Sequence, residues 1–71
     1  MTRERLLVVA HLLTAMKAAF REGKDWRAYE AFVEIEDGGD LEEILYIWKQ
    51  LEPRETNIIK SYQKAARNGQ R

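Results

Sequence analysis

The acidic stretch "EIEDGGDLEE", at positions 34–43, is the part of the chain with the most chemistry to offer a cation. Calcium sites combine carboxylate ligands at fixed spacings with a glycine turn. The spacing of an EF-hand is missing here, and the same residue types are typical of a turn followed by a helix cap. We therefore expect these carboxylates to face a basic protein partner rather than a metal. This acidic partner surface consists of Glu34, Glu36, Asp37, Asp40, Glu42 and Glu43.

Hydrolytic chemistry has few candidates, because Ser61 is the only serine, His11 is the only histidine and cysteine is absent. Nothing near Ser61 in the sequence marks it as an activated nucleophile. Without cysteine, and with one histidine, thiolate and His-rich metal sites are excluded. Paired carboxylates occur, but so thin a domain offers no obvious desolvated cleft that would raise a pKa. We expect no enzyme activity and no cofactor.

The length of 71 residues predicts one domain, residues 1–71. A chain of this size buries only about 60% of its unfolded surface, so good helix packing or oligomerisation must compensate for the absent disulfides. The apolar run near the N-terminus is interrupted by His11 and Thr14. It is far shorter than the ~20 apolar residues of a membrane span. We expect a soluble, cytoplasmic protein with no membrane partner.

The first twenty residues predict an amphipathic helix with Thr2 as N-cap and an end near Glu22-Gly23. Its apolar side chains form a heptad-like seam, which we expect to serve in packing or self-association. This seam consists of Leu6, Val9, Leu13, Met16 and Phe20. A second seam beside it consists of Val8, Leu12, Ala15 and Ala19. The apolar face is thus wide enough to contact two neighbours.

The segment "DWRAYEAFVEIED", at positions 25–37, fits two patterns. As a helix capped by Asp25, it would direct Trp26, Tyr29 and Val33 inward. As a strand, it would alternate apolar and acidic side chains. The chain contains no second strand to pair with it, and unpaired backbone groups are costly. A helix is therefore favoured, and the strand version would require a dimer.

Two further helices are predicted after Gly38-Gly39. Asp40 caps the third helix, with Glu43 three residues later as in a capping box. Pro53 begins the fourth, which ends near Asn68-Gly69. The third helix is expected to turn inward Leu41, Ile44, Leu45, Trp48 and Leu51, with Ile47 beside them. The fourth is expected to gather on one side Ile58, Ile59, Tyr62, Ala65 and Ala66.

The formal net charge of zero conceals three blocks of alternating sign. Residues 1–24 carry a net charge of plus three, residues 25–52 minus seven and residues 53–71 plus four. On a helical wheel the last block forms a basic stripe within about 60°. The stripe consists of Lys60, Lys64, Arg67 and Arg71. It fits a solvated face, a complement to the acidic middle within one molecule or across a dimer, or a phosphate-binding surface.

Together these patterns predict an all-α fold, a small compact bundle of three to four short helices. The favoured function is a protein–protein interaction module, acting as an adaptor, regulator or inhibitor and forming a homodimer. The wide apolar face of the first helix, the thin core and the self-complementary charge blocks motivate this hypothesis.

The alternative hypothesis is a nucleic-acid-binding regulator that uses the fourth helix, with Arg3 and Arg5 of a dimer mate in support. Its contacts would be Arg54, Asn57, Lys60, Lys64, Arg67 and Arg71. Acidic residues at the start of the third helix oppose this hypothesis, because they would repel phosphates.

Overall fold

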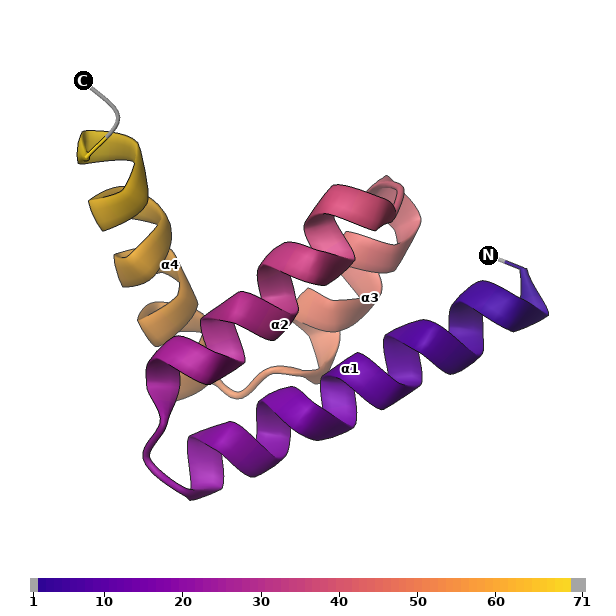
Figure 1. Ribbon diagram of the computed structural model, residues 1–71, viewed down its shortest axis with the longest axis horizontal. Coiled ribbons are helices and arrows are strands. Elements are labelled where there is room, and N and C mark those ends of the chain that lie inside the picture. Colours follow the sequence, from indigo (N-terminus) through magenta and orange to yellow (C-terminus); the bar gives the residue numbers. More distant parts are fainter. Residues whose placement is uncertain (1, 70–71) are drawn as a thin grey trace.

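A computed structural model describes residues 2–69 and shows four α-helices, which confirms the predicted all-α bundle. The helices are α1 (Arg3–Arg21), α2 (Asp25–Gly38), α3 (Leu41–Gln50) and α4 (Pro53–Asn68). In Figure 1, α1 and α2 form a hairpin, α3 lies behind α2, and α4 diverges from α2. The Cα radius of gyration is 11.9 Å, close to the about 11 Å expected for a compact domain of this length.

The α1–α2 hairpin begins and turns as its sequence predicts. The Thr2 hydroxyl accepts a hydrogen bond from the Arg5 backbone N–H at 3.2 Å, which caps α1. Gly23 follows with φ at +75°, a conformation that glycine adopts without steric cost. The Gly23 and Lys24 N–H groups donate to carbonyls in the last turn of α1. This glycine turn sends α2 back along α1.

The segment at positions 25–37, whose sequence fits both a helix and a strand, is helical, but it buries different residues from those expected. Lys24, rather than Asp25, is the N-cap residue of α2. Trp26 is 51% exposed, so its predicted inward position is wrong. The buried side chains of α2 are Ala28, Phe32 and Ile35. The three residues follow the i, i+4, i+7 spacing. The two larger side chains, Phe32 and Ile35, fill the space between α1, α3 and α4.

Helix α3 starts at the predicted cap, but the face that it buries differs from the predicted face. The Asp40 carboxylate accepts the Glu43 N–H at 3.0 Å. Ile47 is fully buried, whereas Leu41 and Leu45 are 69% and 52% exposed, so their predicted inward positions are wrong. Glu43 faces Arg5 of α1. Ile47, four residues later, lies on the same face of α3 and is buried with it.

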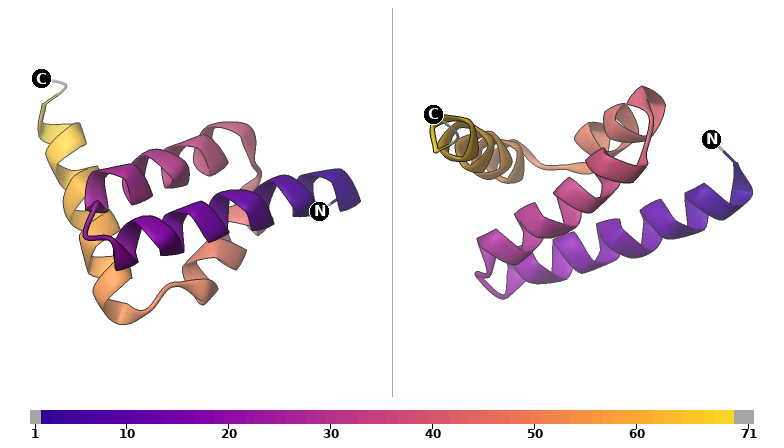
Figure 2. Two further views of the ribbon diagram at one scale, coloured as in Figure 1. Left: turned by 60° about the horizontal axis from the view of Figure 1, so that its bottom comes forward. Right: turned by 45° about the horizontal axis from the view of Figure 1, so that its top comes forward.

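Helix α4 begins at Pro53 and ends at Asn68, as its sequence predicts. Its first turn is closed by a reciprocal capping box between Glu52 and Glu55. Ile59 is fully buried, but Ala65 and Ala66 are exposed, which corrects their predicted packing role. Residues 64–68 at the end of α4 are exposed, and Figures 1 and 2 show this end of the helix extending away from the hairpin.

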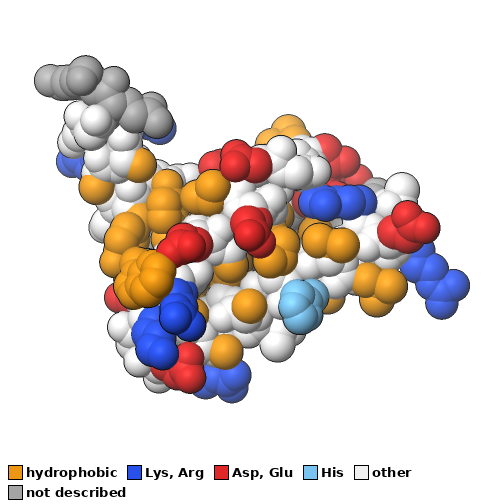
Figure 3. Space-filling model, viewed as in Figure 1, with side chains coloured by type: hydrophobic (Ala, Val, Ile, Leu, Met, Phe, Trp, Pro, Cys, Tyr) orange, Lys and Arg blue, Asp and Glu red, His pale blue; other side chains and the backbone are white. Residues whose placement is uncertain are grey.

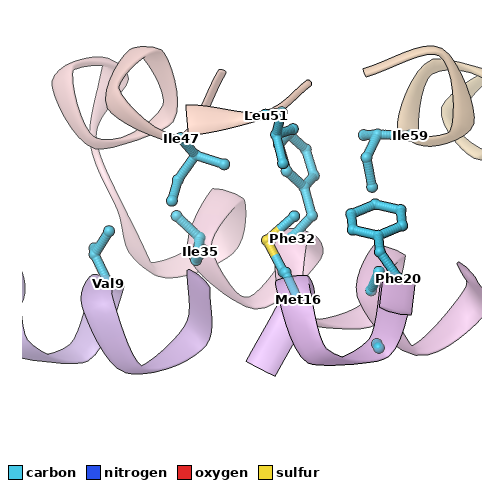
Figure 4. Close-up of a cluster of buried hydrophobic side chains, with 10 residues drawn as sticks. Val9, Met16, Phe20, Phe32, Ile35, Ile47, Leu51 and Ile59 are labelled. Atoms are coloured by element: carbon cyan, nitrogen blue, oxygen red, sulfur yellow. The ribbon is translucent and has the colours of Figure 1, made fainter. Parts of the chain in front are cut away.

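One apolar core joins all four helices (Figure 4). Phe32 lies near its centre and contacts the Trp48 ring at a centroid distance of 5.0 Å. Tyr29 and Tyr62 stack at 5.4 Å and join α2 to α4. The ten buried apolar residues of the core are Val9, Met16, Ala19, Phe20, Ala28, Phe32, Ile35, Ile47, Leu51 and Ile59. Fully burying each large side chain stabilises the fold by about 1.5–3 kcal/mol.

The rotation of α3 is tested by comparing two of its aliphatic residues. We expect Ile47→Ala to lower the free energy of unfolding by about 2–5 kcal/mol, because it opens a cavity in the core. The matched control is Leu41→Ala, which we expect to cost less than about 0.5 kcal/mol because that side chain faces solvent. Urea unfolding followed by circular dichroism measures both, and a larger loss for Leu41→Ala would contradict this packing.

Candidate interaction surfaces

Helix α3 is fastened to the start of α1 by a buried carboxylate. Arg5 donates two hydrogen bonds to Glu43, Nε to Oε1 at 3.0 Å and Nη2 to Oε2 at 2.8 Å. The Glu43 side chain is only 3% exposed. A Cβ at position 39 would overlap this carboxylate and lie 2.6 Å from the Ile35 carbonyl oxygen, so Gly39 makes room for the pair. The Arg5 hydrogen bonds hold the Glu43 pKa below its ordinary value of 4.5, against the opposing effect of burial.

Two sequence predictions change because of this pair. Glu43 does not belong to the exposed acidic partner surface, because its carboxylate is buried and bound to Arg5. Arg5 is likewise committed within the molecule, so it is not free to support nucleic-acid binding from a dimer mate. The pair is bidentate, a geometry that adds directional specificity to the charge attraction.

Helix α4 is fastened to the middle of α1 in a similar way. Glu55, whose side chain is 7% exposed, accepts hydrogen bonds from the Lys17 ammonium and from the Glu52 N–H. Burial raises the Glu55 pKa, but the Glu52 N–H and Lys17 outweigh it and leave the pKa lowered. Lys17 therefore lies at the joint between α1 and α4.

The self-association face predicted on α1 is largely inside the molecule. Val9, Met16 and Phe20 are at most 3% exposed. Leu13 is partly buried against the core, and Leu6 is 45% exposed. The buried members are committed to the fold of one chain, so a partner of any kind must use other surfaces.

The outer side of the α1–α2 hairpin carries an open groove of about 560 Å³. Its floor is made of small or apolar side chains, and Trp26 lies in its lining. The apolar lining residues are Leu12, Ala15, Ala18, Ala19, Trp26 and Ala31. The charged lining residues are Glu22, Arg27, Glu30 and Glu34, and the Arg27 guanidinium lies 5.4 Å from the centroid of the Trp26 ring. The groove is therefore apolar at its base and mainly acidic at its rim.

An acidic stripe runs along α2 beside this groove. Glu30, Glu34 and Asp37 are exposed and follow the i, i+4, i+7 spacing, which places them on one helix face. Red acidic side chains follow α2 in Figure 3, with orange apolar side chains beside them. Of the other predicted acidic residues, Glu36, Asp40 and Glu42 are exposed, and Glu36 lines a separate hollow with Tyr29 and Arg67.

A basic stripe runs along α4. Lys60, Lys64 and Arg67 are exposed, and no ion pair between described residues involves them. Asn57 is exposed, whereas Arg54 lies about 80–140° around the helix from the residues of the stripe. Arg54 lines a hollow of about 360 Å³ with Lys17, Phe20, Arg21, Glu52 and Glu55. The predicted residue Arg71 lies outside the described residues.

The residues considered for catalysis are not brought together. His11 is exposed on α1, and the Ser61 hydroxyl donates to the Asn57 carbonyl within α4 at 2.9 Å. Across residues 2–69, no three His, Asp or Glu side chains are grouped as a metal site requires. Over the same range, no helix combines the length and apolar character needed to cross a bilayer.

Comparison with known proteins adds no relative: no family model, curated protein or solved structure matches the chain. The functional proposals therefore rest on the surfaces described above.

The groove was not predicted from the sequence, because its alanines carry no signal of their own. Sequence reasoning also missed that Glu30, Glu34 and Asp37 share their spacing with Lys60, Lys64 and Arg67, although that signal is present in the sequence.

The two buried carboxylates predict loss of stability in acid. Both have pKa values lowered in the folded state. Their contribution is complete above the unfolded pKa of about 4.5 and is lost as the pH falls through the lower folded values. We expect Glu43→Gln to be less stable than the parent at pH 7 and to show a shallower decline in acid.

Urea midpoints measured by circular dichroism between about pH 7 and pH 3 test this expectation. Glu34→Gln, which removes one exposed carboxylate from α2, is the control and should leave the midpoint at pH 7 nearly unchanged. An equally steep acid decline in the parent and in Glu43→Gln would contradict a stabilising role for the Arg5–Glu43 pair.

Proposed function

We propose that this chain is a protein–protein interaction module without enzyme activity, an adaptor, regulator or inhibitor that works in the cytoplasm. The observation that supports it best is the groove on the outer side of the α1–α2 hairpin. Its alanines, Ala15, Ala18 and Ala31, allow close approach of another backbone. Recognition of a helix in a groove is a common mode of peptide binding.

The charge of the rim specifies the partner's chemistry. Three glutamates and one arginine line the groove, so its rim carries a net negative charge. A partner helix should therefore have an apolar or small-residue side flanked by lysine or arginine. Lysine stems can lie over the apolar floor while their ammonium groups reach the carboxylates.

Trp26 is suited to act as an anchor in this groove. It is 51% exposed although it is one of only two tryptophans, and large aromatic side chains dominate the energy of many interfaces. Contact with a partner would bury the remaining indole surface. The nearby Arg27 would then lie between the tryptophan and the partner's own charges.

A labelled peptide tests the groove directly. The probe is a designed helical peptide with an alanine and leucine face flanked by lysines, and its control carries glutamates in place of the lysines. We expect fluorescence anisotropy to show binding of the basic peptide and at least about tenfold weaker binding of the acidic one, because the rim repels it.

A pair of variants locates the binding. We expect Ala15→Lys to weaken the basic peptide at least about tenfold, since it places a long cation on the groove floor. Thr14→Lys adds the same charge one residue away, outside the groove lining, and should change the affinity little. Equal losses in both variants, or no binding of either peptide to the monomeric protein, would overturn the proposed function.

Nucleic-acid binding is the second candidate function, favoured by the exposed Lys60, Lys64 and Arg67 on α4. If these three groups contact phosphates, duplex affinity should fall on the order of tens of fold between about 50 and 200 mM salt. If the chain is only a protein interaction module, we expect no tight, steeply salt-dependent binding of the duplex. Anisotropy of a labelled duplex at both salt concentrations measures the difference, and a steep loss abolished by Lys60→Glu with Lys64→Glu would establish this second function instead.

A further inference from the structure

We infer that the partner helix is α4 of a second copy of this chain, seated along the acidic side of the groove. The inference rests on the proposed function, because it names the occupant of the same site. Its starting point is a match of spacing: the acidic stripe is Glu30, Glu34 and Asp37, and the basic stripe is Lys60, Lys64 and Arg67. Each stripe follows i, i+4, i+7.

Equal spacing makes the two stripes complementary in register. The first two charges of each stripe are separated by about 6 Å along the helix axis, and the next two by about 4.5 Å. On a helical wheel each stripe spans about 60°. When α4 of one copy lies parallel to α2 of the other, the three pairs of opposite charges lie at matching positions along the two helix axes.

Within one molecule the two stripes do not pair with each other. Helices α2 and α4 meet through the Tyr29–Tyr62 stack. The acidic stripe lies about 100° around α2 from Tyr29, and the basic stripe about 170° around α4 from Tyr62. Both stripes are exposed, and no ion pair joins them within the described residues. Both stripes can therefore meet opposite charges on another molecule.

Two observations favour a second copy in particular. The chain has a formal net charge of zero, so two copies approach without net repulsion. The second half of α4 extends from the body, where a second molecule can reach it (Figures 1 and 2). If the grooves of two copies packed against each other, their acidic rims would repel. A reciprocal exchange, in which each copy gives α4 and receives one, closes a symmetric dimer.

The acidic stripe also belongs to the groove. Glu30 and Glu34 are rim residues, so an α4 seated on the stripe covers the mouth of the groove. The methylene stems of Lys60 and Lys64 would then lie toward the apolar floor while their ammonium groups meet the carboxylates. The dimer contact and the peptide site are thus one surface.

A charge-swap experiment tests the second copy. The groove variant carries Glu30→Lys and Glu34→Lys, and the stripe variant carries Lys60→Glu and Lys64→Glu. Sedimentation equilibrium at low salt should show a parent dimer and, in each variant alone, at least about tenfold weaker association, because each places like charges at both contacts. Mixed together, the two variants should associate again, since every contact is then complementary.

Controls separate this inference from the proposed function. Lys24→Glu with Lys49→Glu changes net charge as the stripe variant does, at exposed sites outside both stripes, and should leave the dimer intact. Glutamine replacements at the same four stripe positions serve if a charge-reversed variant does not fold by circular dichroism. They should weaken the dimer less than reversal does, and an unchanged dimer would overturn the inference.

Each remaining outcome is decisive. A monomer that still binds the basic peptide overturns the second copy and leaves the proposed function standing. A monomer that binds neither peptide overturns both. A dimer insensitive to either variant, or a mixture that fails to associate, shows that copies meet elsewhere. A monomer whose Lys60 and Lys64 bind duplex DNA assigns the basic stripe to nucleic acid.

Discussion

The arrangement of this molecule depends on the burial of two carboxylates, Glu43 and Glu55, each bound by a cation from α1. Removing either partner from a buried pair leaves a charge without compensation, so each pair tolerates few alternative arrangements. Arg5 positions α3 and Lys17 positions α4. Helix α1 thus fixes, through two polar contacts, the orientation of the two helices that come last in the chain.

This orientation separates the surfaces that carry the functional proposals. With α3 and α4 held on the inner side of the hairpin, the outer side of α1 and α2 remains uncovered as a groove. With α4 packed on α2 through Tyr62, the basic stripe on the other side of α4 faces solvent. Glu43 and Glu55 are buried, but the acidic stripe of α2 stays exposed. Opposite charges therefore lie on different faces of the molecule.

Much of the secondary structure could be predicted from sequence because its signals are local. Thr2, Asp40 and Pro53 act within one turn of where they stand, and their caps and helix starts were predicted. Which side of each later helix is buried could not be predicted in the same way. On α3, the apolar residues span more than one face, so periodicity alone placed Leu41 and Leu45 on the inward face and the buried Ile47 only beside it.

The sequence by itself determined the all-α class, the caps at Thr2 and Asp40, the helix start at Pro53 and the blocks of charge, because each depends on neighbours close in the chain. Only the tertiary structure decided that Glu43 is buried while Glu34 is exposed, because a contact across 38 residues selects between them. The same holds for the groove: its alanines become a surface only when two helices lie side by side with nothing over them. Local chemistry fixes where a helix begins, whereas the packing of other helices decides which of its faces another molecule can reach.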